Sequence, residues 1–548
     1  MESKPKEVEE VVETFSEDGE DHPKRGGWIT FPFVTGSMLG LSIAGGGWGS
    51  NLIVFLITKF NVKSISATQI TNIIFGTNNL LPIVGAFIAD SFLGSFSVVV
   101  IFSFLSLLGM TMLTLIATMH SLRPSSCPPG SLTCEGPSNF QYSVLYGALA
   151  LASLGLGGTS FTIATMGADQ FKNPKDQGVF FNWYFMALYV ANLISSTAII
   201  YVEDNVGWGL GFGICFIANA IGILVFLLGK RFYRRVKPMG SPFMSIARVL
   251  VASIRKMKTS LATSRDSDYF YADEVFADNT VPTKSFRFLN RAALKTEKDK
   301  QFDGSYTKSW KLCTVKEVED LKTLIKIMPL WSTGIFLSIT IAISGSLVVL
   351  QALSMDRHLG PHFIIPAGSF PVFNLLATAI SIFIVDRFIL HKLRPLQRVG
   401  IGHVINIVGL VGSALLERGR LGVVRSHNLT NQPGTVVPMS ALWLVAPMSI
   451  MGIGEAFQFP GQVALYYEQF PKPLKSTSTA MMSLLIGIGF YLSTAITHLV
   501  KQTTGWLPNN INQGRLDNVF WMSAVIGVVN FVYYLICAKF FKFQNQNV

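Results

Sequence analysis

The chain has 548 residues, of which 50% are hydrophobic and only 14% are charged, and its formal net charge is +12. A mean hydropathy of +0.44 exceeds what the core of a water-soluble protein of this size requires, so the composition indicates an integral membrane protein in a lipid bilayer. The Lys and Arg residues gather in loops, which the positive-inside rule explains without nucleic acid as a partner.

In chain order, residues 1–27 come first, and we expect this acidic stretch to be disordered and cytoplasmic, with no secretory signal peptide. Apolar segments follow that are long enough to cross a bilayer as α-helices. They lie at 28–57, 68–89, 97–119, 140–165, 179–201 and 209–229, then at 322–352, 363–388, 398–416, 437–467, 477–500 and 517–540. The sequence thus predicts an all-α membrane protein with twelve helices. Its two six-helix halves, 28–229 and 322–541, flank a polar central segment, 230–321, and a cytoplasmic tail, 542–548, ends the chain.

The central segment determines the predicted topology. It opens with five basic residues between Lys230 and Lys237, and basic residues next to a span stay cytoplasmic. Both chain termini are then cytoplasmic as well. Ser241 and Pro242 form a helix start, and the apolar residues after them recur at helical spacing. This pattern predicts an amphipathic helix on the inner leaflet, and a calmodulin-target helix has the same signature.

Two predicted outer loops carry candidates for modification. Asn428 begins an Asn-Leu-Thr triplet, which is the acceptor pattern for N-glycosylation. Cys127 and Cys134 share a loop that the topology places outside the cell, so a disulfide and two free thiols are both open. His358 and His362 have the spacing of a metal pair, but Gly360 and Pro361 interrupt any helix between them, and we expect no metal and no cofactor.

The two halves also repeat each other. Residues 89–93, Ala-Asp-Ser-Phe-Leu, match 385–389, Val-Asp-Arg-Phe-Ile. Residues 169–174, Asp-Gln-Phe-Lys-Asn-Pro, match 468–473, Glu-Gln-Phe-Pro-Lys-Pro. The nearly equal offsets indicate a parallel repeat about an axis along the membrane normal. Major facilitator transporters have this arrangement, with the substrate site between the halves.

Several motifs resemble those of the proton-coupled oligopeptide transporters. Residues 167–171, Gly-Ala-Asp-Gln-Phe, and 180–184, Phe-Phe-Asn-Trp-Tyr, are similar to that family's signature, and 452–457 with 466–470 are similar to its tenth helix. Residues 286–293 resemble the plant branch, the nitrate and peptide transporter family. The resemblance covers most of the chain and implies a major facilitator fold and a transporter, not an enzyme.

The first segment departs from this family, which usually carries Glu-x-x-Glu-Arg there for proton coupling. Met38, Leu41 and Ser42 stand at those positions, and Ser160 replaces a lysine common in the fourth helix. In lacking these charges, and in its sequence Ser-Ile-Ala-Gly-Gly-Gly-Trp-Gly at 42–49, the first segment resembles that of the nitrate excretion transporters, a subgroup of the family. That resemblance implies passive export of nitrate or another small monovalent anion, mainly at the plasma membrane, with the vacuolar membrane as second choice.

Glu455 is the acid that the sequence places well inside a predicted span, where a carboxylate is costly unless it is paired or protonated. It is a functional candidate, and a structural, hydrogen-bonded neutral acid is the alternative. We expect no lysine or arginine deep in a span, and a cavity lined by hydroxyls and amides. The cavity candidates besides Glu455 are Ser42, Ser160, Tyr184, Asn192, Thr340 and Gln458, joined by Asn51, Asn78, Ser344 and Asn374.

This lining favours passive, low-affinity efflux of nitrate, with chloride as a further anion, by alternating access in a monomer or weak dimer. One alternative is a proton-coupled carrier of nitrate or an organic anion that uses Glu455. Another is a nutrient-sensing receptor with little flux. We expect no catalytic residues in any of these cases.

Overall fold

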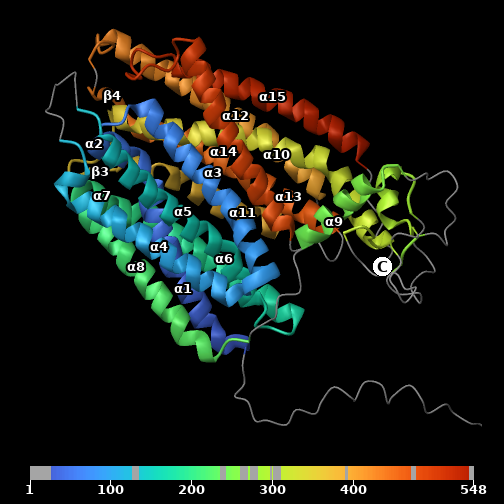
Figure 1. The fold of residues 1–548 in the computed structure, drawn as a ribbon. Helices are drawn as coiled ribbons and strands as arrows, with labels where there is room; N and C mark the ends of the chain where they lie inside the picture. Colours follow the sequence, from blue (N-terminus) through green and yellow to red (C-terminus); the bar gives the residue numbers. More distant parts are fainter. Residues whose placement is uncertain are drawn as a thin grey trace, which may run out of the picture.

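The protein is described here by a computed structural model that covers residues 26–125, 135–234, 242–258, 269–271, 282–296, 299, 310–388, 393–432, 434–470 and 477–541. Within these residues, twelve helices are long and apolar enough to cross a membrane, as predicted. Figure 1 shows them as two bundles side by side, one coloured blue to green and the other yellow to red. The predicted all-α membrane fold is confirmed, since the described strands form only short two-residue to four-residue pairings.

The first bundle contains α1 (Phe31–Ser50), α2 (Leu52–Phe60), α3 (Ser64–Ile88), α4 (Ser95–Thr118), α5 (Asn139–Ala168), α6 (Pro174–Ile194), α7 (Ile200–Asn205) and α8 (Trp208–Leu228). The first predicted span is interrupted at Asn51, so α2 forms a separate outer piece. A π-helical turn, η4 (Ser195–Ile199), joins α6 to α7 in the fifth span.

The second bundle contains α10 (Val315–Ser354), α11 (Pro371–Phe388), α12 (Pro395–Ser426), α13 (Val445–Gln469), α14 (Thr477–Thr503) and α15 (Leu516–Phe540). Strand β1 (Met355–Asp356) pairs in parallel with β4 (Val437–Ser440), and β2 (His358–Leu359) pairs antiparallel with β3 (Phe363–Ile364). Two helices are longer than predicted. A capping box between Thr314 and Glu317 starts α10 before the predicted boundary at 322, and α12 continues past the predicted end at 416.

The loops alternate between two ends of the molecule. At the end that carries the central segment, called the central-segment end, the Gly27 amide donates to the Gln170 carbonyl, and the Gln170 side chain accepts from the Arg234 amide. At the opposite, far end, the Asn61 side chain donates to the Glu135 carbonyl. Asn428 is exposed at this far end, and Cys127 and Cys134 lie outside the described residues.

The central segment forms a small apolar core of its own. Its helix α9 (Pro242–Arg255) buries Val249 and Ala252 against η8 (Arg287–Ala293) and the start of α10. Leu250 and Ile254 on another face of α9 are exposed. Protein therefore covers one apolar face of α9, and only the apolar residues on its other face are free to contact lipid.

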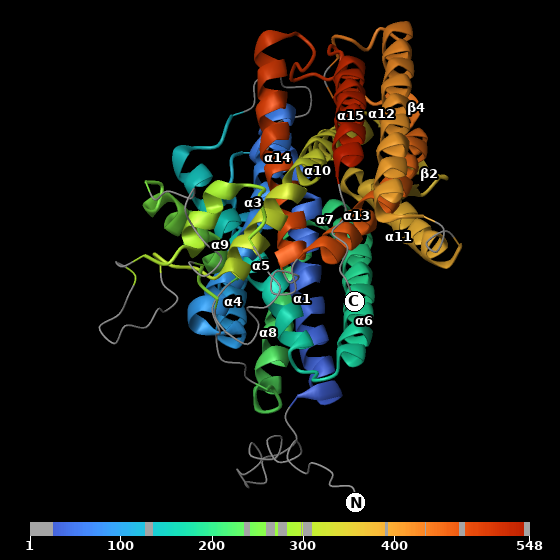
Figure 2. The ribbon, with the colours of Figure 1, turned by 90° about the vertical axis from the view of Figure 1, so that its right-hand side faces the viewer.

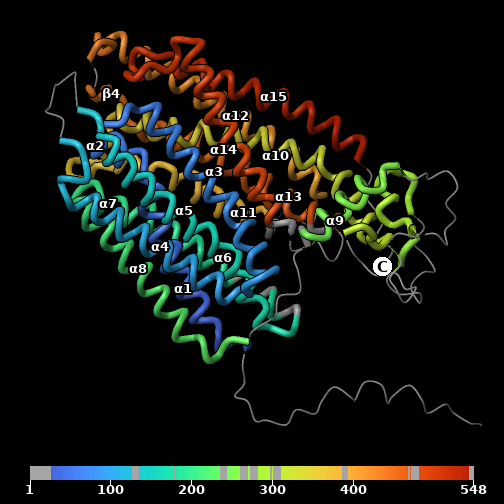
Figure 3. Tube along the Cα trace, viewed as in Figure 1, coloured from blue at the N-terminus to red at the C-terminus, as the bar shows by residue number. Residues whose placement is uncertain are grey.

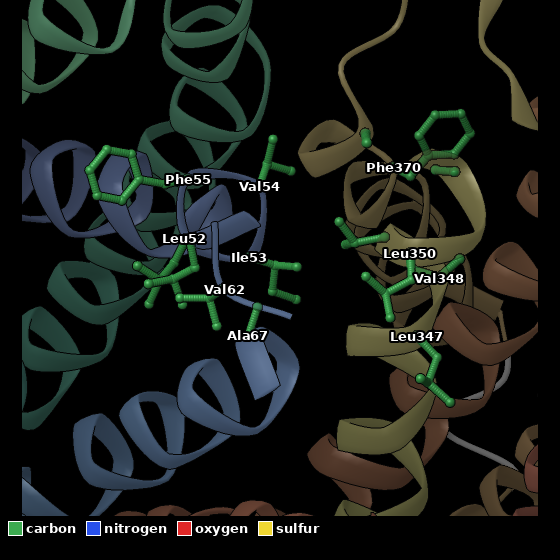
Figure 4. Packing of buried hydrophobic residues seen from close by; sticks show 14 of the residues in the cluster. Leu52, Ile53, Val54, Phe55, Val62, Ala67, Leu347, Val348, Leu350 and Phe370 are labelled. Atoms are coloured by element: carbon green, nitrogen blue, oxygen red, sulfur yellow. The ribbon is translucent and has the colours of Figure 1, made fainter. Parts of the chain in front are cut away.

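The two bundles meet along α3 and α14, which run side by side in Figure 2. There the hydroxyl oxygens of Thr77 and Tyr491 lie 2.7 Å apart. The last helices of the bundles, α8 and α15, lie on opposite outer sides (Figure 3). At the far end an apolar cluster crosses the seam, with Ile53 of α2 on one side and Val348 and Phe370 on the other (Figure 4). This cluster closes the seam at the far end.

Candidate functional site

A cavity of about 280 Å³ lies between the two bundles. Its polar lining includes Asn72 and Thr71 from α3 and Ser344, Asn374 and Glu455 from the second bundle. The other walls are mainly apolar, and they include Ile53, Phe75, Ile341, Val348, Met451 and Phe490. A site between the halves is where a carrier that opens alternately to either side would hold its substrate.

Glu455 is held in this cavity by an amide. The Asn374 Nδ2 atom on α11 donates to Glu455 Oε1 at 3.1 Å. Helices α11 and α13 approach closely here because Gly452 has no side chain, and a Cβ atom at Gly452 would lie 2.5 Å from the Asn374 carbonyl oxygen. The described part of the chain contains no ion pair to Glu455. A neutral amide, not a cation, is thus the partner of the carboxyl group.

Three predicted candidates, Glu455, Ser344 and Asn374, line the cavity. Six other candidates are not among the described lining residues: Ser42, Ser160, Tyr184, Asn192, Thr340 and Gln458. The Ser160 hydroxyl donates to the Leu156 carbonyl at 2.6 Å, and the Thr340 hydroxyl donates to the Leu337 carbonyl at 2.8 Å. Such bonds to the preceding helical turn satisfy a hydroxyl within its own helix.

The other candidates pack elsewhere. Tyr184 is buried in an aromatic cluster, with its ring 5.6 Å from that of Phe180. Asn192 lies close to Gly46 of α1, and Ser42 is half-buried on the same helix. Gln458 is fully buried, and its Nε2 atom lies 3.5 Å from the His403 Nε2 atom on α12.

The positions without charge on α1 are filled by packing. Met38 and Leu41 are buried in an apolar cluster of the first bundle that also contains Ile163 and Phe226. Helix α1 lies close to α8 there, because Gly40 packs against the backbone of α8 at Ala218. Met38 and Leu41 therefore hold apolar side chains that pack inside the first bundle.

A buried ion pair lies in the last third of α12, beyond residue 416, where the sequence predicted that this span ends. Arg420 Nη2 lies 2.6 Å from Glu417 Oε1, and Arg420 Nε donates to Glu417 Oε2 at 2.8 Å. Both side chains are fully buried. The Gln351 amide, which also lines the cavity, donates to Glu417 Oε2 at 2.7 Å. The prediction missed the pair because it ended this span at 416, although opposite charges three residues apart are a helical signal.

A second polar cluster lies at the far end, where α1 ends. The Asn51 Nδ2 atom donates to Glu203 Oε2 and to Asp204 Oδ1, both at 3.0 Å. Gly368 of the second bundle packs against Asn51, and a Cβ atom at Gly368 would overlap Asn51 Oδ1. The rings of Tyr201 and Phe363 also stack across the seam, with centroids 5.7 Å apart. These contacts join the two bundles at the far end.

The described residues contain no group of three or more His, Cys, Asp or Glu side chains that could hold a metal ion. The His358 Nδ1 atom lies 2.5 Å from Asp356 Oδ1, which lowers the pKa of this exposed carboxyl group through the hydrogen bond. The chemistry that the cavity supports is binding and passage of a solute.

Residues 96–513, more than half of the chain, match the model of the POT family. Among curated proteins, "Protein NRT1/ PTR FAMILY 2.3" of Arabidopsis thaliana is 48% identical over 539 residues, covering 96% of this chain and 95% of the relative. "Protein NRT1/ PTR FAMILY 2.7" of the same plant is 48% identical, covering 97% of this chain and 95% of the relative. "Protein NRT1/ PTR FAMILY 3.1", also from Arabidopsis thaliana, is 36% identical, covering 97% and 93%.

Two solved structures share the fold at low identity. An auto-inhibited POT family peptide transporter superposes with a TM-score of 0.70 at 16% identity, covering 95% of this chain and 98% of that one. The POT family transporter PepTSo gives 0.67 at 16% identity, covering 93% and 98%. The twelve-helix arrangement in two halves is therefore that of the POT transporters. By its family match and its plant relatives, this chain belongs to the POT family and is a multi-pass membrane transporter, not an enzyme.

Proposed function

We propose that this transporter belongs to the nitrate excretion subgroup and mediates passive, low-affinity efflux of nitrate, and secondarily of chloride, by alternating access. The observation that carries the proposal is the partner of Glu455, which is the Asn374 amide at 3.1 Å. Met38 and Leu41, at the positions usually charged in the family, are buried in apolar packing.

Coupled, uphill transport needs a titrating group whose charge differs between two states of the cycle, and a partner that responds to that change. Glu455 can titrate, but the described residues give its carboxyl group no cation that would respond. The cavity offers an anion the side-chain amides of Asn72 and Asn374 and the hydroxyl of Ser344. Neutral donors without a fixed positive charge bind a monovalent anion weakly, which suits movement down a gradient.

The test uses purified protein in liposomes with no pH gradient. An inside-positive potential should drive nitrate entry into vesicles with protein, and empty vesicles should show little entry. The Glu455→Gln variant should retain this flux, because no proton has to move with the anion. A strict requirement for an inward proton gradient would overturn the proposal.

A matched variant tests the cavity itself. Asn374→Asp keeps the shape of the side chain but replaces the amide with a second carboxyl group facing Glu455. Because an anion in the cavity would then meet additional negative charge, nitrate flux should fall at least about tenfold. The added charge should not exclude a neutral solute. If the unaltered protein and the Asn374→Asp variant carried nitrate at the same rate, the assignment of this cavity as the nitrate site would be contradicted.

One observation favours a second candidate function, a proton-coupled carrier. Glu455 is a carboxyl group that lines the cavity between the two bundles. Such a carboxyl group is a proton site by chemistry. If coupling operates, Glu455→Gln should abolish nitrate accumulation against a gradient while exchange of nitrate across the membrane continues.

We further infer that the central-segment end is cytoplasmic and that the protein resides in the plasma membrane. The support is the basic cluster that begins at Lys230 and the exposed Asn428 at the far end. A glycan on Asn428 of the protein expressed in plant cells, lost in an Asn428→Gln variant, would establish this orientation. Modification of Lys230 by an impermeant reagent outside intact cells would exclude it.

A further inference from the structure

A polar pocket of about 360 Å³ lies at the far end between α12 and α15, away from the central cavity. Its lining includes three arginines, Arg418 and Arg425 from α12 and Arg515 at the start of α15. Arg515 is paired with Asp517 through Nε to Oδ1 at 3.1 Å and Nη2 to Oδ2 at 3.2 Å. In the described part of the molecule, the guanidinium groups of Arg418 and Arg425 have neither a hydrogen-bond nor an ion-pair partner. The pocket thus holds three cations against one carboxylate.

The position of this pocket relative to a lipid bilayer follows from the two helices that form it. On α12, the 18 residues 399–416 contain no Asp, Glu, Lys or Arg. At 1.5 Å per residue they span about 27 Å, close to the roughly 30 Å thickness of a bilayer's hydrocarbon core. On α15 the uncharged stretch runs from 518 to 538, again about the thickness of the core. Arg418 and Arg515 lie two and three residues beyond these stretches, at the depth of lipid headgroups, and Arg425 lies about 10 Å further out along α12 while its side chain lines the same pocket.

The helix dipole accounts for one of the three arginines. Arg425 lies in the last turn of α12, where a cation is favourable. Arg418 lies about two turns earlier, and Arg515 stands at the N-cap of α15, where the dipole disfavours a positive charge. The half-exposed Trp521 beside them is at a depth where aromatic residues meet headgroups.

We propose that Arg418, Arg425 and Arg515 form a binding site for the phosphate group of a phospholipid headgroup in the far-end leaflet. Guanidinium groups match phosphate oxygens with paired, charge-assisted hydrogen bonds. Asp517 holds the Arg515 guanidinium by two of its N–H groups and so fixes its orientation. Trp521, which lies deeper in the membrane than Arg515 on α15, supplies apolar surface for the part of the lipid below the phosphate.

The test measures lipid binding to the purified full-length chain by native mass spectrometry in detergent. Phosphatidylglycerol should bind, and diacylglycerol, which lacks the phosphate, should not compete. The variant Arg418→Gln with Arg425→Gln should weaken phosphatidylglycerol binding by about tenfold or more, since it removes two charged donors.

The matched control is Lys59→Gln with Lys501→Gln, which removes the same charge from the last turns of α2 and α14 at the same end but outside the pocket. This control should bind lipid like the unaltered protein. Nitrate flux and thermal unfolding of the arginine variant report whether it is folded. Equal lipid binding by both variants, or equal binding of diacylglycerol, would overturn the proposal. If millimolar inorganic phosphate displaced phosphatidylglycerol and the site showed no preference for the lipid, the site would be one for free phosphate. The proposal of a lipid site would then be refuted.

Discussion

The buried pair of Glu417 and Arg420 should contribute strongly to stability, and Glu417→Gln tests this. Arg420 contacts the two oxygens of the Glu417 carboxylate at 2.6 and 2.8 Å. The change to Gln keeps the size of the side chain but replaces this carboxylate with a neutral amide, so the buried guanidinium loses its opposite charge. Removing one partner of a buried pair costs about 3–5 kcal/mol. The other hydrogen bonds of Arg420, to Asn512 Oδ1 at 2.6 Å, the Ser354 hydroxyl at 3.2 Å and the Ile511 carbonyl at 3.4 Å, supply no opposite charge. We therefore expect the free energy of unfolding to fall by about 3 kcal/mol or more.

The assay is SDS-induced unfolding of the purified protein, followed by tryptophan fluorescence. The matched control is Asp517→Asn, which breaks the pair between Arg515, whose side chain is 49% exposed, and Asp517, whose side chain is 7% exposed. Because the Arg515 guanidinium stays in contact with water when it loses its partner, this variant should lose only about 1 kcal/mol or less.

A second control replaces both members of the buried pair with methionine. Since no uncompensated charge then remains, much of the lost stability should return. If Glu417→Gln destabilised the protein by no more than Asp517→Asn, the reasoning from burial would be refuted.

Three further predictions follow from close contacts and from burial. Gly40→Val should lower the free energy of unfolding by about 1–3 kcal/mol, because any side chain would overlap the Ala218 carbonyl of α8, and Gly213→Val, whose site is open, is the control. Tyr491→Phe should cost about 0.5–1.5 kcal/mol by removing the 2.7 Å contact with Thr77, as measured by the same unfolding assay. Burial raises the pKa of Asp169, and a neighbouring carboxyl group adds to this, so the native state binds its proton more tightly than the unfolded chain. Stability from this group thus falls as pH rises through its folded-state pKa, and Asp169→Asn should be the more stable protein at neutral pH, with an advantage that disappears in acid.

The sequence predicted the helices well because a span of lipid requires a long apolar run. It misplaced boundaries where charges continue inside a helix. Thr314 and Glu317 cap α10 early, and Glu417 and Arg420 satisfy each other within α12, so neither charge ends its helix. An apolar-run criterion cannot detect such pairing.

The cavity was predicted in part. Glu455 and Asn374 line it, but Gln458, three residues after Glu455, faces α12 and lies beside His403. A three-residue step turns a side chain by about 300° around a helix, so the rotation of α13 in the bundle decides which residue faces the cavity. Local sequence does not contain that rotation. Ser160 was an equally polar candidate, yet its hydroxyl is satisfied by its own helix.

The contact between Asn51 and Gly368 has a consequence for the conformational equilibrium between carrier molecules closed at the far end and molecules open there. At this point the bundles touch through an amide and a residue that has only hydrogen at its α-carbon. A methyl group there would force Asn51 and Gly368 apart, so Gly368→Ala should shift the population towards molecules that are open at the far end. Which conformation is most populated thus depends on glycine, the smallest residue, at position 368.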